Sequence, residues 1–310
     1  MVYAAVACIG VGVVVVAVTA VRLGDEAGGQ QRRAAVTVAA PSGTIIFQGG
    51  RTRLGVPELL TVSARGGTPA PLRGKRFHGI EPAFSTDGRY LGYGEWVTQD
   101  DDRGGRHGNN VVVSLSDGSH PRVVIPQGWA ESAHHNWPTW SHDGQLLRVT
   151  SSDPARPDST THVVAARGGP PRRIAPVELE RWAPPRAGRA LVVRRGNRWG
   201  IAWYEADADT ATTFLKGGGQ PMWSPTWPEF AFTVGGVTLV FDTTVRKSRV
   251  VARTRCGYAG RPAWSPNGDW LAYFTCDPDG AALHVVRRDG KRSRAVTDPG
   301  VGGYAPSWRR

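Results

Sequence analysis

Residues 261–275 read RPAWSPNGDWLAYFT, and this stretch predicts a β-hairpin. A short strand ends at Trp264, the segment Ser-Pro-Asn-Gly forms the turn, and a second strand follows Gly268. The proline pre-sets φ for the turn, the asparagine tolerates a left-handed backbone, and Gly268 accepts a positive φ at no steric cost. The flanking residues are apolar, β-branched or aromatic, which is typical of a largely buried hairpin.

The same pattern recurs along the chain. Copies read EPAFSTDGRYLGY, WPTWSHDGQLLRV, ERWAPPRAGRALVV (a degraded copy) and QPMWSPTWPEFAF, and APSWRR ends the sequence as a half-copy. The aromatic anchors of the repeat are Phe84, Trp140, Trp182, Trp223, Trp264 and Trp308. Apart from a longer first interval, successive anchors lie about 40–45 residues apart, which is the spacing of four-stranded propeller blades.

Each interval between anchors holds a second strand–turn–strand pattern, and three of these five turns contain Asp-Gly or Gly-Gly. A strand at residues 43–48 and a hairpin at 58–72 have no anchor strand before them, whereas 305–310 is an anchor strand with nothing after it. These pieces together complete one blade. The sequence therefore predicts an all-β fold, a six-bladed β-propeller with four-stranded blades, in which the N-terminal strands close the ring by pairing with the C-terminal strand.

The pattern x-P-x-W-S-P-[DN]-G-x-x-L-A-[YF] resembles the TolB-like propeller repeat, also described as a WD40-like Pro-Asp repeat. The resemblance covers residues 43–310, and its best copies lie at 261–274, 220–232 and 81–93. It implies a bacterial, extracytoplasmic protein, because proteins with this repeat are mostly exported. Nothing in the sequence matches the N-terminal α/β domain of TolB itself, so a role in a Tol system is not implied.

The N-terminal segment differs from the rest of the chain. Residues 2–21 contain no charge, and twenty apolar residues suffice for a helix that spans a bilayer. We expect residues 1–22 to be a transmembrane anchor or a cleaved signal peptide, with a lipidated Cys8 as a third alternative. Residues 23–41 are expected to form a flexible tether before the propeller domain at 42–310. The expected location is extracytoplasmic, membrane-anchored or secreted.

Cysteine usage supports export. Cys256 and Cys276 flank the best copy of the repeat, and an antiparallel hairpin would bring them nearly opposite each other. In an oxidising compartment two cysteines so placed usually form a disulfide. The alternative is a pair of buried free thiols.

Topology indicates where a binding site would lie. In a propeller blade, the loop between the second and third strands and the connection to the next blade share one face of the ring. The longest insertion, at 97–110, and the loop before Trp140 both fall on this face. Variable loops on a rigid scaffold often carry function. The binding residues expected at this channel mouth are Asp100, Asp101, Asp102, His107, His134, His135 and Asn136.

The chemistry of these loops favours binding over catalysis. Carboxylates with imidazoles suit several divalent ions, but successive Asp residues on a Gly-rich loop are typical of a solvated turn, so we expect no metal site. The serines of the repeat turns recur in each blade, which indicates turn capping. There is no G-x-S-x-G elbow, and we expect no catalytic residues and no cofactor. A carbohydrate-active lyase or hydrolase at the same mouth is the alternative.

The chain is basic, with 38 Lys and Arg against 26 Asp and Glu, and a net charge of +12. Basic residues gather in turns between third and fourth strands: Arg172, Arg173, Arg246, Lys247, Arg249, Arg287, Arg288, Lys291 and Arg292. Such turns attract an anionic membrane surface or envelope polymer, unless they are merely solvated. Nucleic acid is not expected. The sequence thus favours a monomeric, non-enzymatic protein-interaction or scaffold module of the cell envelope, which binds a protein or peptide.

Overall fold

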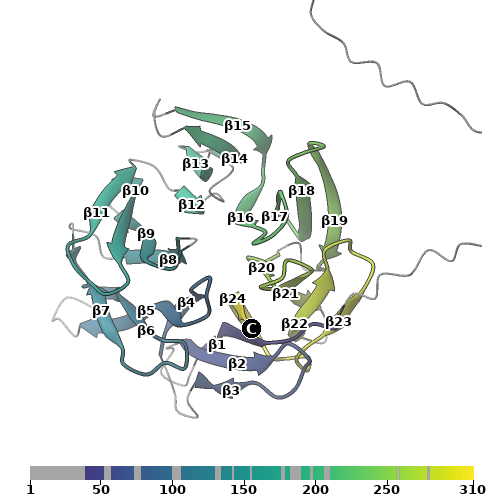
Figure 1. Cartoon of the computed structure of the whole chain (residues 1–310), viewed down its shortest axis with the longest axis horizontal. Helices are drawn as coiled ribbons and strands as arrows, with labels where there is room; N and C mark the ends of the chain where they lie inside the picture. The colour runs from purple at the N-terminus through teal and green to yellow at the C-terminus, as the bar shows by residue number, and fades with distance from the viewer. Residues whose placement is uncertain are drawn as a thin grey trace, which may run out of the picture. The chain divides into compact units, whose positions relative to one another are not determined.

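The computed structural model describes residues 39–310 apart from 52–56, 73–77, 100–105, 130–133, 142, 154–155, 176–178, 182–189, 196–197, 206–209, 256, 258 and 278–279. All of its named elements are β-strands, and they form four-stranded antiparallel sheets. Figure 1 shows these sheets arranged around a common centre, with one short strand of each sheet innermost. The expected all-β propeller with four-stranded antiparallel blades is confirmed.

The sheets follow one another around the ring in chain order (Figure 1). One sheet contains β24 (Gly303–Arg309), β1 (Thr44–Arg51), β2 (Pro57–Ser63) and β3 (Ala70–Pro71). The next contains β4 (Ile80–Phe84), β5 (Tyr90–Gln99), β6 (Arg106–Leu115) and β7 (Arg122–Ile125). It is followed by the sheet of β8 (His134–Trp140), β9 (Leu146–Asp153), β10 (Arg156–Ala165) and β11 (Arg172–Ala175). The others contain β12 (Leu179–Arg181), β13 (Ala190–Arg195), β14 (Arg198–Glu205) and β15 (Thr210–Lys216); β16 (Gly219–Trp223), β17 (Glu229–Val234), β18 (Val237–Asp242) and β19 (Lys247–Arg253); and β20 (Ala263–Trp264), β21 (Trp270–Asp277), β22 (Gly280–Arg287) and β23 (Ser293–Ala295).

The two ends of the propeller domain meet in one sheet. Strand β24 pairs antiparallel with β1, with Ile45 opposite Trp308 and Gly49 opposite Gly303. The final strand therefore supplies the innermost strand that the N-terminal hairpin lacks, as the sequence predicted. This pairing removes an open sheet edge from the ring.

The repeat turn forms as its residue types dictate. In the sheet β20–β23, the N–H of Gly268 donates to the carbonyl of Ser265 over 2.8 Å, and Gly268 has a φ of 72°. The Ser265 N–H donates in turn to the carbonyl of Trp270, which closes the hairpin. A positive φ carries no steric penalty for glycine, so the sequence favours a reversal at this point.

The core lies between neighbouring sheets. Ile45, Phe47 and Trp308 from one sheet are buried against Phe274 and other residues of the sheet β20–β23. The rings of Phe47 and Phe274 pack edge to face with centroids 5.3 Å apart. Stacking of amphipathic sheets buries a continuous core without one large interior, as in other repeat proteins.

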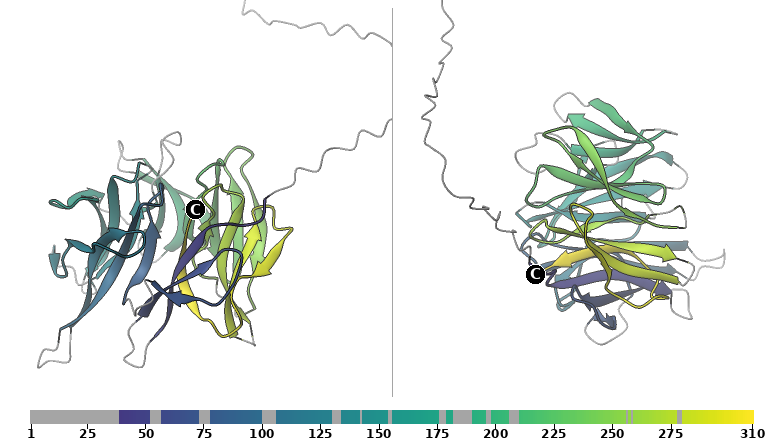
Figure 2. Two further views of the ribbon diagram at one scale, coloured as in Figure 1. Left: turned by 60° about the horizontal axis from the view of Figure 1, so that its bottom comes forward. Right: turned by 90° about the vertical axis from the view of Figure 1, so that its right-hand side faces the viewer.

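Two views show how the strands run through the ring. In Figure 2 the strands cross the thickness of the disc, so that each sheet presents its turns at one face or the other. Backbone bonds between turns agree: the N–H of Ser116 donates to the carbonyl of Arg89, and that of Arg288 to the carbonyl of Asp269. We call this face, which carries the turns between first and second and between third and fourth strands, the turn face. The opposite side is the loop face.

The N-terminal predictions lie mostly outside the described residues. These include the apolar helix, anchor or signal at 1–22 and the first part of the tether. Residues from Ala39 onward belong to the same compact unit as the strands, and the Trp270 indole N–H donates to the carbonyl of Ala39 over 3.2 Å. Within the described part of the chain, no helix is long and apolar enough to cross a membrane.

Candidate functional site

A cavity of about 520 Å³ opens at the turn face, at the centre of the ring. Its walls are the ends of β4, β8, β16, β20 and β24, the strands that lie innermost in Figure 1, together with the turns that follow β4, β16 and β20. Most of the lining residues occupy repeat positions from the proline to the turn serine, whereas Arg261 precedes its proline. The lining residues include Pro82, Ser85, Trp140, Trp223, Ser224, Pro225, Arg261, Trp264, Ser265, Ser307 and Arg309.

The turn serines in this lining are fixed by hydrogen bonds. Ser85 Oγ donates to Asp87 Oδ1 over 2.6 Å and accepts the backbone N–H of Tyr90 over 2.9 Å. Ser265 repeats this arrangement with Asn267 and Trp270. The hydroxyls therefore cap turns, as the recurrence of the serines indicated. Each hydroxyl both donates and accepts a hydrogen bond within its own turn.

The turn carboxylate has a lowered pKa. Burial acts to raise the pKa of Asp87, but the hydrogen bonds from Ser85 and from the N–H of Arg89, together with the Arg89 charge, outweigh it. The net pKa lies below the usual aspartate value. Asp87 is therefore ionised at neutral pH and already engaged by its own turn.

Anchor tryptophans connect neighbouring sheets. Trp140 Nε1 donates to the carbonyl of Ala83 over 2.8 Å, and Trp264 Nε1 donates to the carbonyl of Met222 over 2.7 Å. In each case the acceptor is the residue just before the anchor of the preceding repeat. Trp223 breaks the pattern, because its indole N–H is buried and has no hydrogen-bond partner among the described residues.

The other anchors vary this theme. Trp308 Nε1 donates to the carbonyl of Ser42 over 2.9 Å. Phe84 has no N–H on its ring, and its backbone N–H donates instead to Ser307 Oγ, while the Arg309 guanidinium lies 5.1 Å from its ring centroid. The predicted anchor Trp182 lies outside the described residues.

The cavity wall is rich in cationic donors. Arg261 is only 3% exposed, and its Nε is buried without a hydrogen-bond partner in the described part of the chain. Arg309 donates to Ser116 Oγ through Nη1, but its Nε is likewise buried without an acceptor. Asp87 is the one acidic side chain among the described lining residues. The site therefore offers more hydrogen-bond donors and positive charge than it can itself satisfy.

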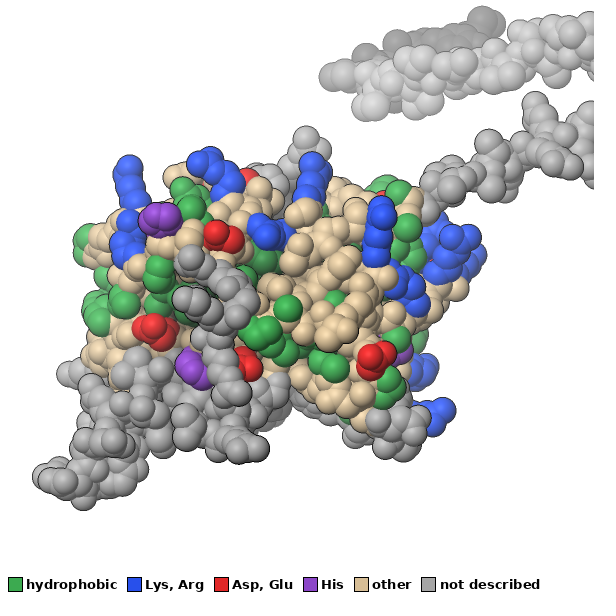
Figure 3. Space-filling model, turned by 90° about the horizontal axis from the view of Figure 1, so that it is seen from below, with side chains coloured by type: hydrophobic (Ala, Val, Ile, Leu, Met, Phe, Trp, Pro, Cys, Tyr) green, Lys and Arg blue, Asp and Glu red, His purple; other side chains and the backbone are tan. Residues whose placement is uncertain are grey.

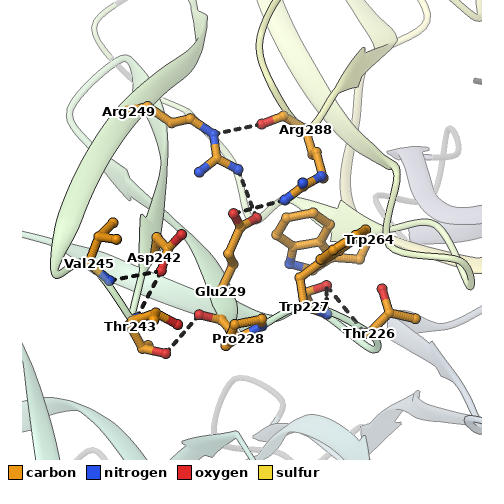
Figure 4. Close-up of polar contacts among 12 residues, drawn as sticks. Thr226, Trp227, Pro228, Glu229, Asp242, Thr243, Val245, Arg249, Trp264 and Arg288 are labelled. Carbon is orange, nitrogen blue, oxygen red and sulfur yellow. Dashed lines mark hydrogen bonds and ion pairs between the residues drawn. The ribbon is translucent and has the colours of Figure 1, made fainter. Parts of the chain in front are cut away.

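An ion cluster joins two neighbouring sheets of the ring. Figure 4 shows Arg249 and Arg288 reaching the carboxylate of Glu229, which is buried. Arg249 Nη2 lies 2.7 Å from Glu229 Oε2, and Arg288 Nη1 lies 2.9 Å from Oε1. The Arg288 guanidinium also lies 4.0 Å from the ring centroid of the exposed Trp227. Glu229 and Arg249 come from the sheet β16–β19 and Arg288 follows β22, so the cluster holds adjacent blades together.

The site predicted from the sequence is elsewhere. Asp100, Asp101 and Asp102 lie outside the described residues. His107 lies in β6 opposite Thr98, at the end of the β5–β6 hairpin far from the turn face. The expected loop at 97–110 is therefore wrong in part: strands β5 and β6 continue to Gln99 and from Arg106, because their backbones stay paired along the whole hairpin.

The described residues of the second predicted loop also belong to a strand. His134, His135 and Asn136 lie in β8 and pair with Ser152, Ser151 and Thr150 of β9. These three residues begin β8, whereas Trp140 ends it and lines the cavity, so they lie at the opposite end of the strand from the cavity. The cavity thus lies at the mouth opposite to the one that the sequence favoured, and the binding role of the loop-face residues stays a prediction.

The expected disulfide is described on one side only. Cys276 lies in β21 opposite Ala281 and is disulfide-bonded. Its predicted partner, Cys256, lies outside the described residues. The pairing of the two therefore stays a prediction.

Basic side chains project from one face of the ring in Figure 3. Of the turn residues singled out by sequence, Arg172, Arg173, Arg246, Lys247, Lys291 and Arg292 are exposed. Arg249 and Arg288 are instead partly buried and paired with Glu229. Arg287, also partly exposed, pairs with Asp289 at 3.4 Å. Three members of the predicted basic set therefore have an acidic partner.

The sequence reasoning missed Arg261 as a site residue. The signal was present, because Arg261 stands at the position before the proline in x-P-x-W, where other repeats have Glu81, Gln220 and Ala305. A charged side chain at a position whose neighbours line a channel would have identified it. Among the described residues, no group of three or more His, Cys, Asp and Glu could hold a metal ion.

Comparison with known proteins identifies the fold. No family model matches the sequence, and no curated protein matches it. Among solved structures, TolB from Acinetobacter baumannii is similar with a TM-score of 0.68 and 16% identity, over 87% of this chain and 67% of TolB. A chain of a nidogen/laminin complex is similar with a TM-score of 0.58 and 12% identity, over 86% of this chain and 98% of that chain.

A chain of Kuenenia stuttgartiensis hydrazine synthase is similar as well, with a TM-score of 0.64 and 12% identity, over 86% of this chain and 47% of that one. At these identities the likeness extends to the fold and not to the activity. The chain shares the β-propeller fold of TolB and of these proteins.

Proposed function

We propose that this chain is a non-enzymatic interaction module, a six-bladed propeller that binds a protein or peptide in the channel at its turn face. The observation that supports the proposal is the central cavity of about 520 Å³ with its surplus of hydrogen-bond donors. Concave sites with apolar walls and a few polar groups are typical binding sites. The walls here combine Trp223 and Trp264 with Arg261.

The side chains of the cavity favour binding over catalysis. A nucleophilic serine needs a neighbouring base, whereas Ser85 and Ser265 each donate to the acceptor within their own turn. By resemblance to TolB-like repeat proteins, the partner would belong to a bacterial cell envelope, and the protein would be extracytoplasmic and anchored or secreted. A lyase or hydrolase at the loop face stays an alternative, since enzymes also contain this fold.

Selection of peptides tests the proposal. Random peptides displayed on phage would be selected against the immobilised full chain, and the affinities of the selected peptides measured by fluorescence anisotropy. In a blocked variant, Pro225→Trp, a large side chain is added at an exposed position of the cavity wall. In the matched control, Val245→Trp, the same side chain is added at an exposed turn position that is not part of the wall.

We expect the selected peptides to bind the parent and Val245→Trp alike, and to bind Pro225→Trp at least about tenfold more weakly, because the added indole occupies the entrance. Peptides that bind all three proteins equally would contradict the proposal. Selected peptides that lose affinity only when the loop face is altered would move the site to the mouth first favoured by the sequence.

The exposed basic turns support a second candidate partner, an anionic membrane or envelope polymer. The lysines and arginines on one face of the ring in Figure 3 would attract such a surface through long-range electrostatics. Sedimentation with phosphatidylserine vesicles tests it. Neutralising Lys247, Lys291 and Arg292 should reduce the bound fraction, whereas an unchanged fraction would exclude these turns as the contact.

A further inference from the structure

The guanidinium of Arg261 is a buried charge that lacks a counter-ion in the described part of the chain. The residue is 3% exposed, its Nε has no hydrogen-bond partner, and it lines the central cavity. Removing a cation from water is unfavourable unless it is paired, and a buried polar group without a partner calls for an explanation. By contrast, Arg249 and Arg288, which are more exposed, both contact Glu229.

The acidic side chain of the cavity wall does not supply the missing partner. Asp87 accepts hydrogen bonds from Ser85 Oγ and from the N–H of Arg89, and its ion pair is with Arg89, at 3.9 Å. At the repeat position of Arg261, the sheet β16–β19 has Gln220, whose amide donates to the hydroxyl of Tyr304. The channel therefore holds Arg261 without an acidic side chain bonded to it.

Further donors of the same wall also lack acceptors. The indole N–H of Trp223 and the Nε of Arg309 are both buried and without hydrogen-bond partners among the described residues. Both residues line the cavity with Arg261. The turn serines cannot serve as acceptors for a ligand's donors without breaking their own turns. A ligand that fits this wall must bring acceptor atoms and negative charge.

We propose that Arg261 is an anion-binding residue, and that its guanidinium holds a carboxylate of an acidic peptide segment that enters the channel from the turn face. A guanidinium presents its donors in a planar fork that matches the two oxygens of a carboxylate. The exposed arginines of the turn face attract the same charge from a distance. The inference rests on the proposed function, because it names the chemistry of the ligand at the same cavity.

The carboxylate can come from an acidic side chain or from the C-terminus of a peptide. The probes are therefore a fluorescein-labelled hexa-aspartate peptide with an amidated C-terminus, the matching hexa-asparagine amide, and hexa-asparagine with a free C-terminus. Binding of each to the full chain is followed by fluorescence anisotropy. The variants are Arg261→Gln, which removes the charge, Arg261→Lys, which keeps the charge without the fork, and Arg292→Gln, which removes one exposed charge from the same face.

We expect the hexa-aspartate peptide, the free-carboxylate peptide or both to bind the parent. Arg261→Gln should weaken that binding by about tenfold or more, as expected for the loss of a charge-assisted hydrogen bond. Arg261→Lys should bind with intermediate affinity, and Arg292→Gln should change the affinity by less than about twofold because its charge is exposed and screened. The probe whose binding depends on Arg261 shows whether the carboxylate of the ligand comes from an acidic side chain or from a C-terminus.

Equal affinity of Arg261→Gln and the parent for every carboxylated probe would overturn the inference, as would equal binding of the hexa-asparagine amide. Circular dichroism and urea unfolding establish that the variants fold. Removal of an unpaired buried charge should leave Arg261→Gln at least as stable as the parent. If selected peptides lose affinity for Pro225→Trp but not for Arg261→Gln, the anion site fails and the proposed function stands. If no peptide depends on Pro225, the proposed function itself fails.

Discussion

Nη1 of Arg288 lies 2.9 Å from Oε1 of Glu229, and this contact joins two sheets of the propeller. Glu229 is nearly inaccessible to solvent and also pairs with Arg249 of its own sheet. Replacing Glu229 with glutamine should lower the free energy of unfolding by about 1–3 kcal/mol, because it leaves two partly buried guanidinium groups without their anion. Urea unfolding of the purified chain measures the change.

A matched control lies nearby. Arg287 and Asp289 form an ion pair at 3.4 Å, but both side chains are about a third exposed and lie in one turn. Such pairs contribute little, so Asp289→Asn should change the free energy of unfolding by less than about 1 kcal/mol. Equal losses for the two variants would show that the Glu229 cluster does not hold the blades together.

The anchor tryptophans allow a second comparison. Trp264 Nε1 donates to the carbonyl of Met222, whereas Trp223 Nε1 is buried without a described partner. Replacing either with phenylalanine removes the indole N–H. We expect Trp264→Phe to destabilise the chain by about 1 kcal/mol more than Trp223→Phe, because only the former breaks a hydrogen bond between sheets. Thermal and urea unfolding of both variants provide the measurement, and an inverse order would contradict the described pattern.

Gly268 sits where two turns touch. Its φ is 72°, and a Cβ at this position would collide with Thr226 Oγ1 and lie 2.9 Å from Trp227 Cδ1. Gly268→Ala therefore combines backbone strain with a steric conflict, and should lower stability by about 2 kcal/mol or more. Gly128→Ala has a similar φ of 78° but open space around the new methyl group, so it should cost less. Similar losses of stability in the two variants would mean that backbone strain accounts for the whole effect and that the steric conflict at Gly268 contributes nothing.

His162 makes stability depend on pH. Its pKa is lowered, first because burial disfavours the imidazolium and second because of the Arg173 charge. The unfolded chain then takes up the proton at a higher pH than the folded chain. The contribution of His162 to the free energy of unfolding should therefore be fully present above the ordinary histidine pKa of about 6.5, and it should decline as the pH falls below that value. Urea unfolding between pH 8 and 5 should show a smaller decline for His162→Gln, and an equal decline would assign it to other groups.

The fold could be predicted because the repeat is encoded locally. Each hairpin can be predicted from about a dozen of its own residues. The signals are the Ser-Pro-Asn-Gly turn, the glycine of positive φ and the alternation of apolar residues. The closure of the ring followed from an incomplete unit at each end, and β24 pairs with β1 accordingly. The degraded copy corresponds to β12, whose described span is only Leu179–Arg181.

The candidate site was harder to predict because it depends on which turns meet at the centre. Hydrophilic composition at 97–110 resembled a loop, but backbone pairing across the hairpin extends the strands through Gln99 and from Arg106. Sequence pattern does not report such pairing when side chains are polar on both sides. Arg261 was overlooked because its burial and lack of a partner arise only when five first strands converge.

The most direct test of the central claim is photo-cross-linking of a selected peptide. A benzophenone amino acid would be placed at Thr86, an exposed residue of the cavity wall, or at Thr98, which lies opposite His107 at the far end of its hairpin. The account predicts a cross-linked adduct from position 86 that excess unlabelled peptide abolishes, and none from position 98. An adduct from position 98 alone would contradict the claim, because it would place the peptide at the loop face.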